Sequence, residues 1–285
     1  MRSTRWTKAA AIVATGLTVA ACTSGRADDT ASSDGLPMVP AEAGHLHGMG
    51  VNPADDKLYL GTHAGLMVVE DDGVERVGEA TIDLMGFAIA GPDHFYASGH
   101  PGLRDDLPNP VGLIETTDGG QSWRVLSLSG ESDFHTLAAS PDAAYGFDGA
   151  LRATVDGRTW TAGAPDVETW SIAIDPEEAT TLVATTDRGP VISTDGGKTF
   201  AGLADAPPVA LLAWPESDAL WGITADGDLF LSTDGGASWT AQGNTGGAPE
   251  AFTASDADSV FVALEDGIQR SDDSGKTFEP IAGRA

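Results

Sequence analysis

Short apolar runs alternate with polar, glycine-rich turns through most of the chain, and no long amphipathic helix is predicted. Six such runs recur, most of them followed within two residues by Pro or Asp: 45–51, 84–90, 134–140, 170–175, 209–214 and 251–255. A second run, rich in β-branched and aromatic residues, follows each of them: 57–61, 94–98, 144–147, 181–185, 219–224 and 259–264. This pattern predicts an all-β protein of short, sequentially paired strands.

A short motif, first seen as Thr-Asp-Gly-Gly-Gln-Ser-Trp at 117–123, recurs four more times, and its second copy is one residue short. The aspartates of the five copies are separated by 38, 39, 39 and 39 residues: Asp118, Asp156, Asp195, Asp234 and Asp273. Asp accepts hydrogen bonds from backbone N–H groups, Gly adopts positive φ, and the closing aromatic residue packs inward. We therefore interpret these residues as structural, within a repeat architecture.

Two less regular units, 45–78 and 84–127, extend the repeat toward the N-terminus. Six units of roughly 40 residues each match four-stranded propeller blades, and a closed ring leaves few exposed sheet edges. The sequence thus predicts a six-bladed β-propeller over residues 45–285, and it leaves the mode of ring closure open.

The repeated motif resembles the Asp-box, or BNR repeat, of sialidases, xyloglucanases, sortilin-type receptors and photosystem assembly factors. The segments 45–51 and 97–101 look similar to bacterial Asp-box lipoproteins labelled glycosyl hydrolase or exo-sialidase. Such a resemblance implies a propeller scaffold and a glycosidase or binding function. Sialidases also carry three clamping arginines, a Tyr/Glu nucleophile pair and a Phe/Tyr-Arg-Ile-Pro motif. Because none of these is recognisable here, sialidase activity is not expected.

The N-terminal segment has the pattern of an export signal. Basic residues precede an uncharged Ala/Val-rich run at 9–21, which is too short to span a bilayer and ends at Cys22, the only cysteine. The run resembles a bacterial lipobox, which implies a signal peptide at 1–21, lipidation of Cys22, and anchoring at the extracytoplasmic side of the cell membrane. An ordinary secretory signal with a chance cysteine is the alternative. Residues 22–44 are predicted to form a flexible tether.

Composition excludes some classes of partner. The chain carries 43 acidic and 15 basic residues, a formal net charge of −28. Nucleic acid and anionic lipid surfaces are therefore not expected to bind this protein.

Histidines are confined to the first half of the chain. In an up-and-down blade, the start of the first strand and the loop between the second and third strands lie at the same face. Five histidines are therefore predicted to meet near one mouth of the channel: His45, His47, His63, His100 and His135. His94 falls at the opposite face, and Met85 takes the first-strand position in blade two as a further candidate ligand-binding residue.

Two interpretations of this His-rich mouth stay open. Imidazole with thioether suits copper, and imidazole with carboxylate suits zinc, so a transition-metal site is one hypothesis. The other is that the histidines hydrogen-bond within the loops of a water-filled channel and bind no metal.

An insertion at 101–110 is predicted to lie over the same mouth. The candidate ligand-binding residues there are Arg104, Asp105 and Asp106, together with Asp148. A glycoside hydrolase would need two facing carboxylates, for which Asp105, Asp106, Glu115 and Asp148 are candidates. The sequence favours a lipid-anchored binding protein with a glycan or protein partner at the channel mouth. A glycoside hydrolase is the alternative.

Overall fold

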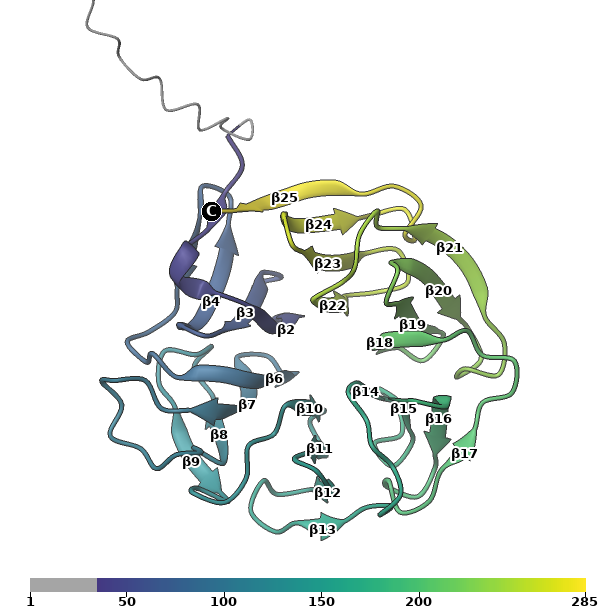
Figure 1. The fold of residues 1–285 in the computed structure, drawn as a ribbon, viewed down its shortest axis with the longest axis horizontal. Coiled ribbons are helices and arrows are strands. Elements are labelled where there is room, and N and C mark those ends of the chain that lie inside the picture. Colours follow the sequence, from purple (N-terminus) through teal and green to yellow (C-terminus); the bar gives the residue numbers. More distant parts are fainter. Residues whose placement is uncertain (1–34) are drawn as a thin grey trace, which may run out of the picture. The chain divides into compact units, whose positions relative to one another are not determined.

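The computed structural model describes residues 35–285 and shows six small β-sheets arranged in a closed ring around a central channel (Figure 1). The predicted all-β, six-bladed propeller is therefore confirmed. The predicted signal peptide, Cys22 and the first part of the predicted tether lie outside the described residues. Within the described part of the chain, no helix is long and apolar enough to cross a membrane.

The first three blades each contain four antiparallel strands, numbered from the channel outward. Blade one comprises β2 (Leu46–Val51), β3 (Leu58–Thr62), β4 (Gly65–Glu70) and β5 (Gly73–Arg76). Blade two comprises β6 (Asp83–Gly91), β7 (His94–His100), β8 (Leu113–Thr116) and β9 (Arg124–Ser127). Blade three comprises β10 (Thr136–Ala139), β11 (Ala144–Phe147), β12 (Leu151–Thr154) and β13 (Thr161–Ala162).

The last three blades follow the same order, and blade six gains a fifth strand. Blade four comprises β14 (Ile172–Ile174), β15 (Leu182–Thr186), β16 (Gly189–Ser193) and β17 (Ala201–Gly202). Blade five comprises β18 (Val209–Glu216), β19 (Ala219–Thr224), β20 (Asp228–Ser232) and β21 (Thr240–Asn244). Blade six comprises β22 (Ala251–Ala254), β23 (Val260–Leu264), β24 (Gly267–Ser271), β25 (Glu279–Arg284) and β1 (Met38–Val39).

Closure of the ring uses residues on the N-terminal side of the predicted boundary at His45. β1 pairs in parallel with β25, and a short 3-10 helix, Ala41–Ala43, leads from it into blade one. Arg284 Nη2 donates a hydrogen bond to the carbonyl oxygen of Gly44. Met38 pairs with Gly283 and Val39 with Arg284, so the strand depends on a partner from the far end of the chain.

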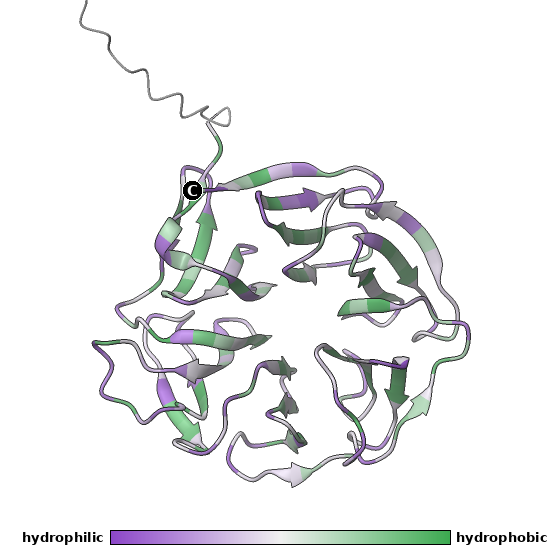
Figure 2. Cartoon of the chain, viewed as in Figure 1, coloured by the Kyte–Doolittle hydropathy of each residue, from purple (hydrophilic) through white to green (hydrophobic). Residues whose placement is uncertain are grey.

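The hydrophobic core lies within and between neighbouring blades. Apolar residues concentrate on the inner and middle strands, whereas the connecting loops are mainly polar (Figure 2). Phe95, Phe134 and Trp221 are fully buried. Close packing at the mouth requires glycine in β6: a Cβ at Gly86 would lie 2.2 Å from the carbonyl oxygen of Phe134 in the next blade.

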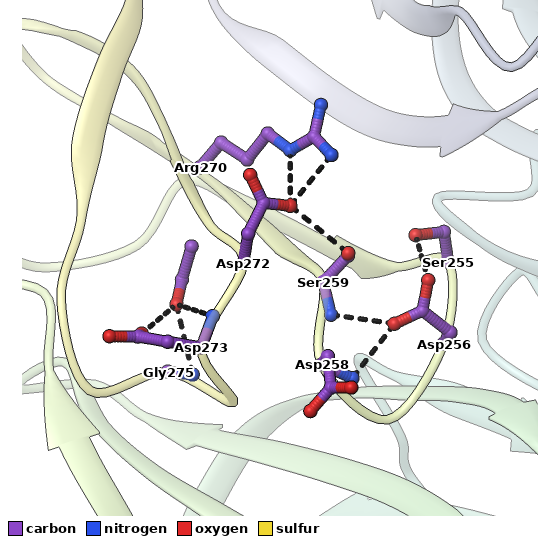
Figure 3. A network of polar contacts seen from close by, with 9 residues as sticks. Ser255, Asp256, Asp258, Ser259, Arg270, Asp272, Asp273 and Gly275 are labelled. Atoms are coloured by element: carbon purple, nitrogen blue, oxygen red, sulfur yellow. Dashed lines mark hydrogen bonds and ion pairs between the residues drawn. The ribbon is translucent and has the colours of Figure 1, made fainter.

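The five copies of the repeated motif form the loops between third and fourth strands, here called the repeat loops. In blade six, Ser271 Oγ donates to Asp273 Oδ1 at 2.8 Å and accepts from the Gly275 N–H at 3.0 Å. Figure 3 shows Asp273 and Gly275 in this loop. Asp273 Oδ1 also accepts from the Thr277 N–H at 2.8 Å. Hydrogen bonds from the backbone and from Thr277 lower the pKa of Asp273 to about 2. The aspartate is thus a structural acceptor that closes its loop.

Candidate functional site

The six innermost strands line a central channel of about 650 Å³. Its mouth is defined here as the end at which β2, β6 and β10 begin. His47, His135, Trp170 and Glu250 line the channel near this end. Trp170 is 49% exposed, an unusual position for so large an apolar side chain.

Bulges in the first two blades help to place the mouth residues. The pairing of β2 with β3 shifts between Leu46 and Gly48, so His47 is an extra residue without a direct partner. A shift between Leu84 and Gly86 puts Met85 in the equivalent position of β6. A bulge re-aims the side chain at the point where it occurs.

His47, His63 and Asp83 form the first imidazole cluster, which has His45 at its edge. The Nε2 atoms of His47 and His63 are 3.2 Å apart, and their rings meet edge to face with centroids 4.5 Å apart. His63 Nδ1 lies 2.8 Å from Asp83 Oδ1 in the neighbouring blade. His45 approaches His63 with ring centroids 5.8 Å apart. His47, His63 and Asp83 each offer one ligand atom, and these three atoms lie within 4.8 Å of one another, which is close enough to share a metal ion.

The atom pairing in this cluster assigns a role to each group. A carboxylate only accepts, so His63 donates through Nδ1 to Asp83, and the lone pair of its Nε2 accepts the hydrogen bond from His47 Nε2, whose proton a bound metal ion would replace. Metal-binding histidines commonly carry such a carboxylate on the other ring nitrogen. Two imidazole nitrogens that share a tetrahedral ion at bond lengths of 2.0–2.1 Å are about 3.3 Å apart. The observed Nε2–Nε2 separation of 3.2 Å matches this requirement.

Electrostatics favour the neutral, ligating form of His47. Burial and, secondarily, the neighbouring His63 lower the pKa of His47, whereas Asp83 raises it by less. The His63 backbone is fixed by its N–H, which donates to the Ala43 carbonyl at 3.0 Å. The ring-closing segment therefore helps to position the cluster.

His100, Asp133 and His135 form the second imidazole cluster, between blades two and three. The Nε2 atoms of His135 and His100 lie 2.8 Å and 3.3 Å from the same oxygen, Asp133 Oδ2. His100 Nδ1 also contacts Asn109 Oδ1 at 2.7 Å. The five predicted histidines therefore divide into two groups at one face of the ring, each organised by a carboxylate.

Several other predicted site residues lie away from the channel. Arg104, Asp105 and Asp106 line a separate groove at the rim of the ring, not the channel mouth over which the insertion was predicted to lie. The physical reason is Asp105 Oδ2, which accepts from Thr81 N–H at 3.2 Å and from Gly102 N–H at 3.1 Å and folds the loop back against the link between blades one and two.

Two candidate carboxylates are held in ion pairs. Asp148 contacts Arg152 Nε at 3.2 Å from both oxygens. Glu115, a candidate catalytic carboxylate, lies toward the opposite end of its sheet and is almost fully buried between Arg124 and His94, whose Nε2 is 2.8 Å away. Glu115 is therefore not a mouth residue.

Asp83, Asp133 and Trp170 are mouth residues that the sequence reasoning missed. Asp83 precedes Met85 by two residues and Asp133 precedes His135 by two, with a buried residue between the members of each pair. His45 and His47 have the same spacing in blade one. Since alternate residues of a strand share a face, this polar–buried–polar pattern is a signal that could have identified both aspartates.

No protein-family model matches the chain, and no curated protein matches it by sequence. Among solved structures, a GH74 enzyme of Niastella koreensis is similar, with a TM-score of 0.62 and 14% identity over 86% of this chain and 46% of that one. The GH74 xyloglucanase of Xanthomonas campestris gives 0.56 and 16% identity over 84% of this chain and 45% of that one. This chain thus spans about half the length of these enzymes.

YCF48 from Cyanidioschyzon merolae is also similar, and the similarity covers most of both chains. Its TM-score is 0.52 at 17% identity, over 83% of this chain and 84% of that one. A structure of YCF48 bound to D1 peptide gives 0.51 at 18% identity, over 86% of this chain and 87% of that one. At these identities the comparisons show a shared propeller fold.

Proposed function

We propose that this protein is a lipid-anchored, extracytoplasmic binding protein whose channel mouth binds one transition-metal ion through His47 and His63. The observation that carries the proposal is the 3.2 Å separation of their Nε2 atoms, with Asp83 on Nδ1 of His63. An oxygen of Asp83 lies within 4.8 Å of the ligand nitrogens of both histidines, and His45 lies at the edge of the cluster. Acylation at Cys22 would hold the site near the membrane surface.

Copper and zinc both fit this set of donors. Imidazole nitrogen is a good ligand for either ion, and a given nitrogen site generally binds Cu²⁺ more tightly than Zn²⁺. We therefore expect Cu²⁺ to displace Zn²⁺ from the first cluster when both are present in excess.

We also propose that the propeller belongs to the Asp-box class. Support comes from the repeat loops, in which a Ser or Thr hydroxyl donates to the motif carboxylate in the same way at Asp118, Asp195 and Asp273. A protein or glycan partner at the mouth is consistent with the similar propellers, since YCF48 has been observed with a peptide and one GH74 enzyme is a xyloglucanase. Trp170 is the exposed contact residue that such a partner would meet.

Glycoside hydrolysis is less well supported by the geometry. It needs one carboxylate as proton donor and a second that faces it across the scissile bond. The mouth carboxylates each have another partner: Asp83 contacts His63, Asp133 contacts two histidines, and Glu250 Oε2 accepts from Arg284 Nη1 at 2.6 Å. These contacts favour binding over hydrolysis.

The test is metal content and affinity. Residues 35–285, which contain all six blades and the closing strand, would be loaded with Cu²⁺ or Zn²⁺, dialysed, and analysed by mass spectrometry and calorimetry. We expect one ion per chain, lost in His47→Ala and His63→Ala and retained in His135→Ala. Absence of stoichiometric metal from the wild-type protein, or retention in both first-cluster variants, would overturn the proposal.

A further inference from the structure

A second concave surface lies at the rim of the ring, between the outer part of blade one and the insertion of blade two. The loop from β7 to β8 extends outward there (Figure 1). This rim groove has a volume of about 710 Å³ and is lined by Arg76, Glu79, Arg104, Asp106, Leu107 and Trp123, among others. Sites for small ligands commonly have volumes of about 300–1,000 Å³.

The loop that forms one wall of the groove is held in place by specific contacts. Asp105 Oδ2 accepts hydrogen bonds from the Thr81 N–H, the Thr81 hydroxyl and the Gly102 N–H at 3.1–3.2 Å. At the far end of the loop, the Pro110 carbonyl accepts from the Gly130 N–H at 2.7 Å. Arg104 and Asp106 are therefore presented on an ordered loop, which lowers the entropy lost when a ligand binds.

Trp123 differs from the other tryptophans at its position in the repeat loops. Trp160 Nε1 donates to Ser127 Oγ at 2.9 Å, and Trp239 Nε1 donates to the Gly236 carbonyl at 3.1 Å. Within residues 35–285, Trp123 Nε1 has no hydrogen-bond partner, and its side chain is only partly buried and lines the groove. An indole with one apolar face and one free donor is suited to a ligand that has both kinds of surface.

Four of the five charged side chains of the groove are also unpaired, Asp105 being the exception. Arg76, Glu79, Arg104 and Asp106 are exposed, and none of them forms an ion pair or side-chain hydrogen bond within the described part of the chain. They supply donors from the guanidinium groups and acceptors from the carboxylates in one concave surface. Such a mixture fits a ligand rich in hydroxyl groups, because each hydroxyl donates and accepts.

We propose that the rim groove binds a neutral oligosaccharide, with a sugar ring against Trp123 and its hydroxyl groups hydrogen-bonded to Arg76, Arg104, Glu79 and Asp106. A neutral sugar is favoured over a polyanion because the net charge of −28 repels anionic polymers and the groove itself contains both signs of charge. This site is separate from the channel and does not depend on the proposed metal site.

The groove is tested with an array of neutral and uronate-containing oligosaccharides, applied to residues 35–285, followed by calorimetry on the neutral compounds that bind. Arg76→Ala and Arg104→Ala remove exposed, unpaired side chains, so the fold should be retained. Each is expected to weaken binding by about tenfold or more, because a hydrogen bond from a charged group is lost. Arg158→Ala is the matched control, since Arg158 is an exposed arginine on the repeat loop of blade three.

A conservative variant tests the indole donor. Trp123→Phe should fold, because Phe200 and Phe278 occupy the same motif position in blades four and six. We expect it to weaken sugar binding, whereas Trp160→Phe and His47→Ala should leave sugar binding unchanged. Failure of every neutral oligosaccharide to bind, binding of uronate compounds alone, or binding that survives both arginine substitutions would overturn the proposal. A peptide ligand captured in the groove instead of a sugar would overturn it too.

Discussion

Nδ1 of His63 and Oδ1 of Asp83 lie 2.8 Å apart, although the two residues belong to different blades. This contact joins blade one to blade two at the channel mouth and fixes which nitrogen of His63 faces His47. The interblade contact therefore connects the packing of the propeller to the chemistry of its mouth.

Asp83→Ala should lower the affinity of the first cluster for Cu²⁺ or Zn²⁺ by about 10–100-fold, as expected for removal of a carboxylate that orients a metal-binding histidine. Calorimetric titration of wild type and variant measures the change. Asp142→Ala, which removes an exposed carboxylate outside the cluster, is the control. An unchanged affinity in Asp83→Ala would show that His63 needs no support from blade two.

Much of the architecture could be predicted because the repeat is encoded locally. The 38–39-residue spacing of the motif and the short apolar runs placed all six first strands and all six second strands. Chain closure by Met38–Val39 was not predictable, since it depends on pairing with β25 about 245 residues away. Local patterns carry no information on such a partner.

The site was predicted less completely, for a related reason. Antiparallel pairing placed His63 and His100 at the mouth with the first-strand histidines, but their division into two clusters depends on Asp83 and Asp133. Likewise, the insertion turns toward the rim because Asp105 bonds to Thr81, 24 residues earlier in the chain. Such side-chain contacts between separate elements determine what a loop covers.

Packing at the mouth predicts that replacing Gly86 destabilises the protein more than replacing Gly73 does. Gly86→Ala would place a methyl group 2.2 Å from the Phe134 carbonyl oxygen, and relieving this overlap requires a backbone shift between blades. We expect a loss of about 1–3 kcal/mol in the free energy of unfolding, measured by chemical denaturation. Gly73→Ala is the matched control, because no atom lies within 4 Å of the position that its methyl group would take. Equal effects of the two substitutions would contradict the close approach seen at Gly86.

Acid should destabilise the propeller through its repeat loops. The pKa values of Asp156, Asp195 and Asp273 are lowered to about 2 by hydrogen bonds from their own loops. Because these values lie below the ordinary unfolded value of about 3.9, their contribution is fully present above about pH 4 and is lost as the pH falls through about 2. Thermal unfolding followed by circular dichroism should therefore show a falling Tm across this window.

A single substitution isolates the contribution of one repeat loop. Asp195→Asn should lower the Tm at neutral pH and reduce its fall under acid conditions, because the variant has one ionisable acceptor fewer. Asp187→Asn, at an exposed position next to Arg188, is the control and should leave both quantities nearly unchanged. A pH dependence identical to that of wild type in Asp195→Asn would refute the assignment of acid sensitivity to these loops.

The first cluster also predicts opposite titration shifts in two variants of the metal-free protein. Burial and the nearby His63 lower the pKa of His47, and Asp83 partly offsets them. His63→Ala should therefore raise the pKa of His47, since the lowering effect of His63 is lost and the attraction to Asp83 remains. Asp83→Asn should lower the same pKa further, because it removes the compensating negative charge. NMR titration of the imidazole Cε1–H signals measures both shifts. An unchanged His47 pKa in both variants, or a shift in the same direction in both, would contradict the opposite electrostatic effects of these two neighbours.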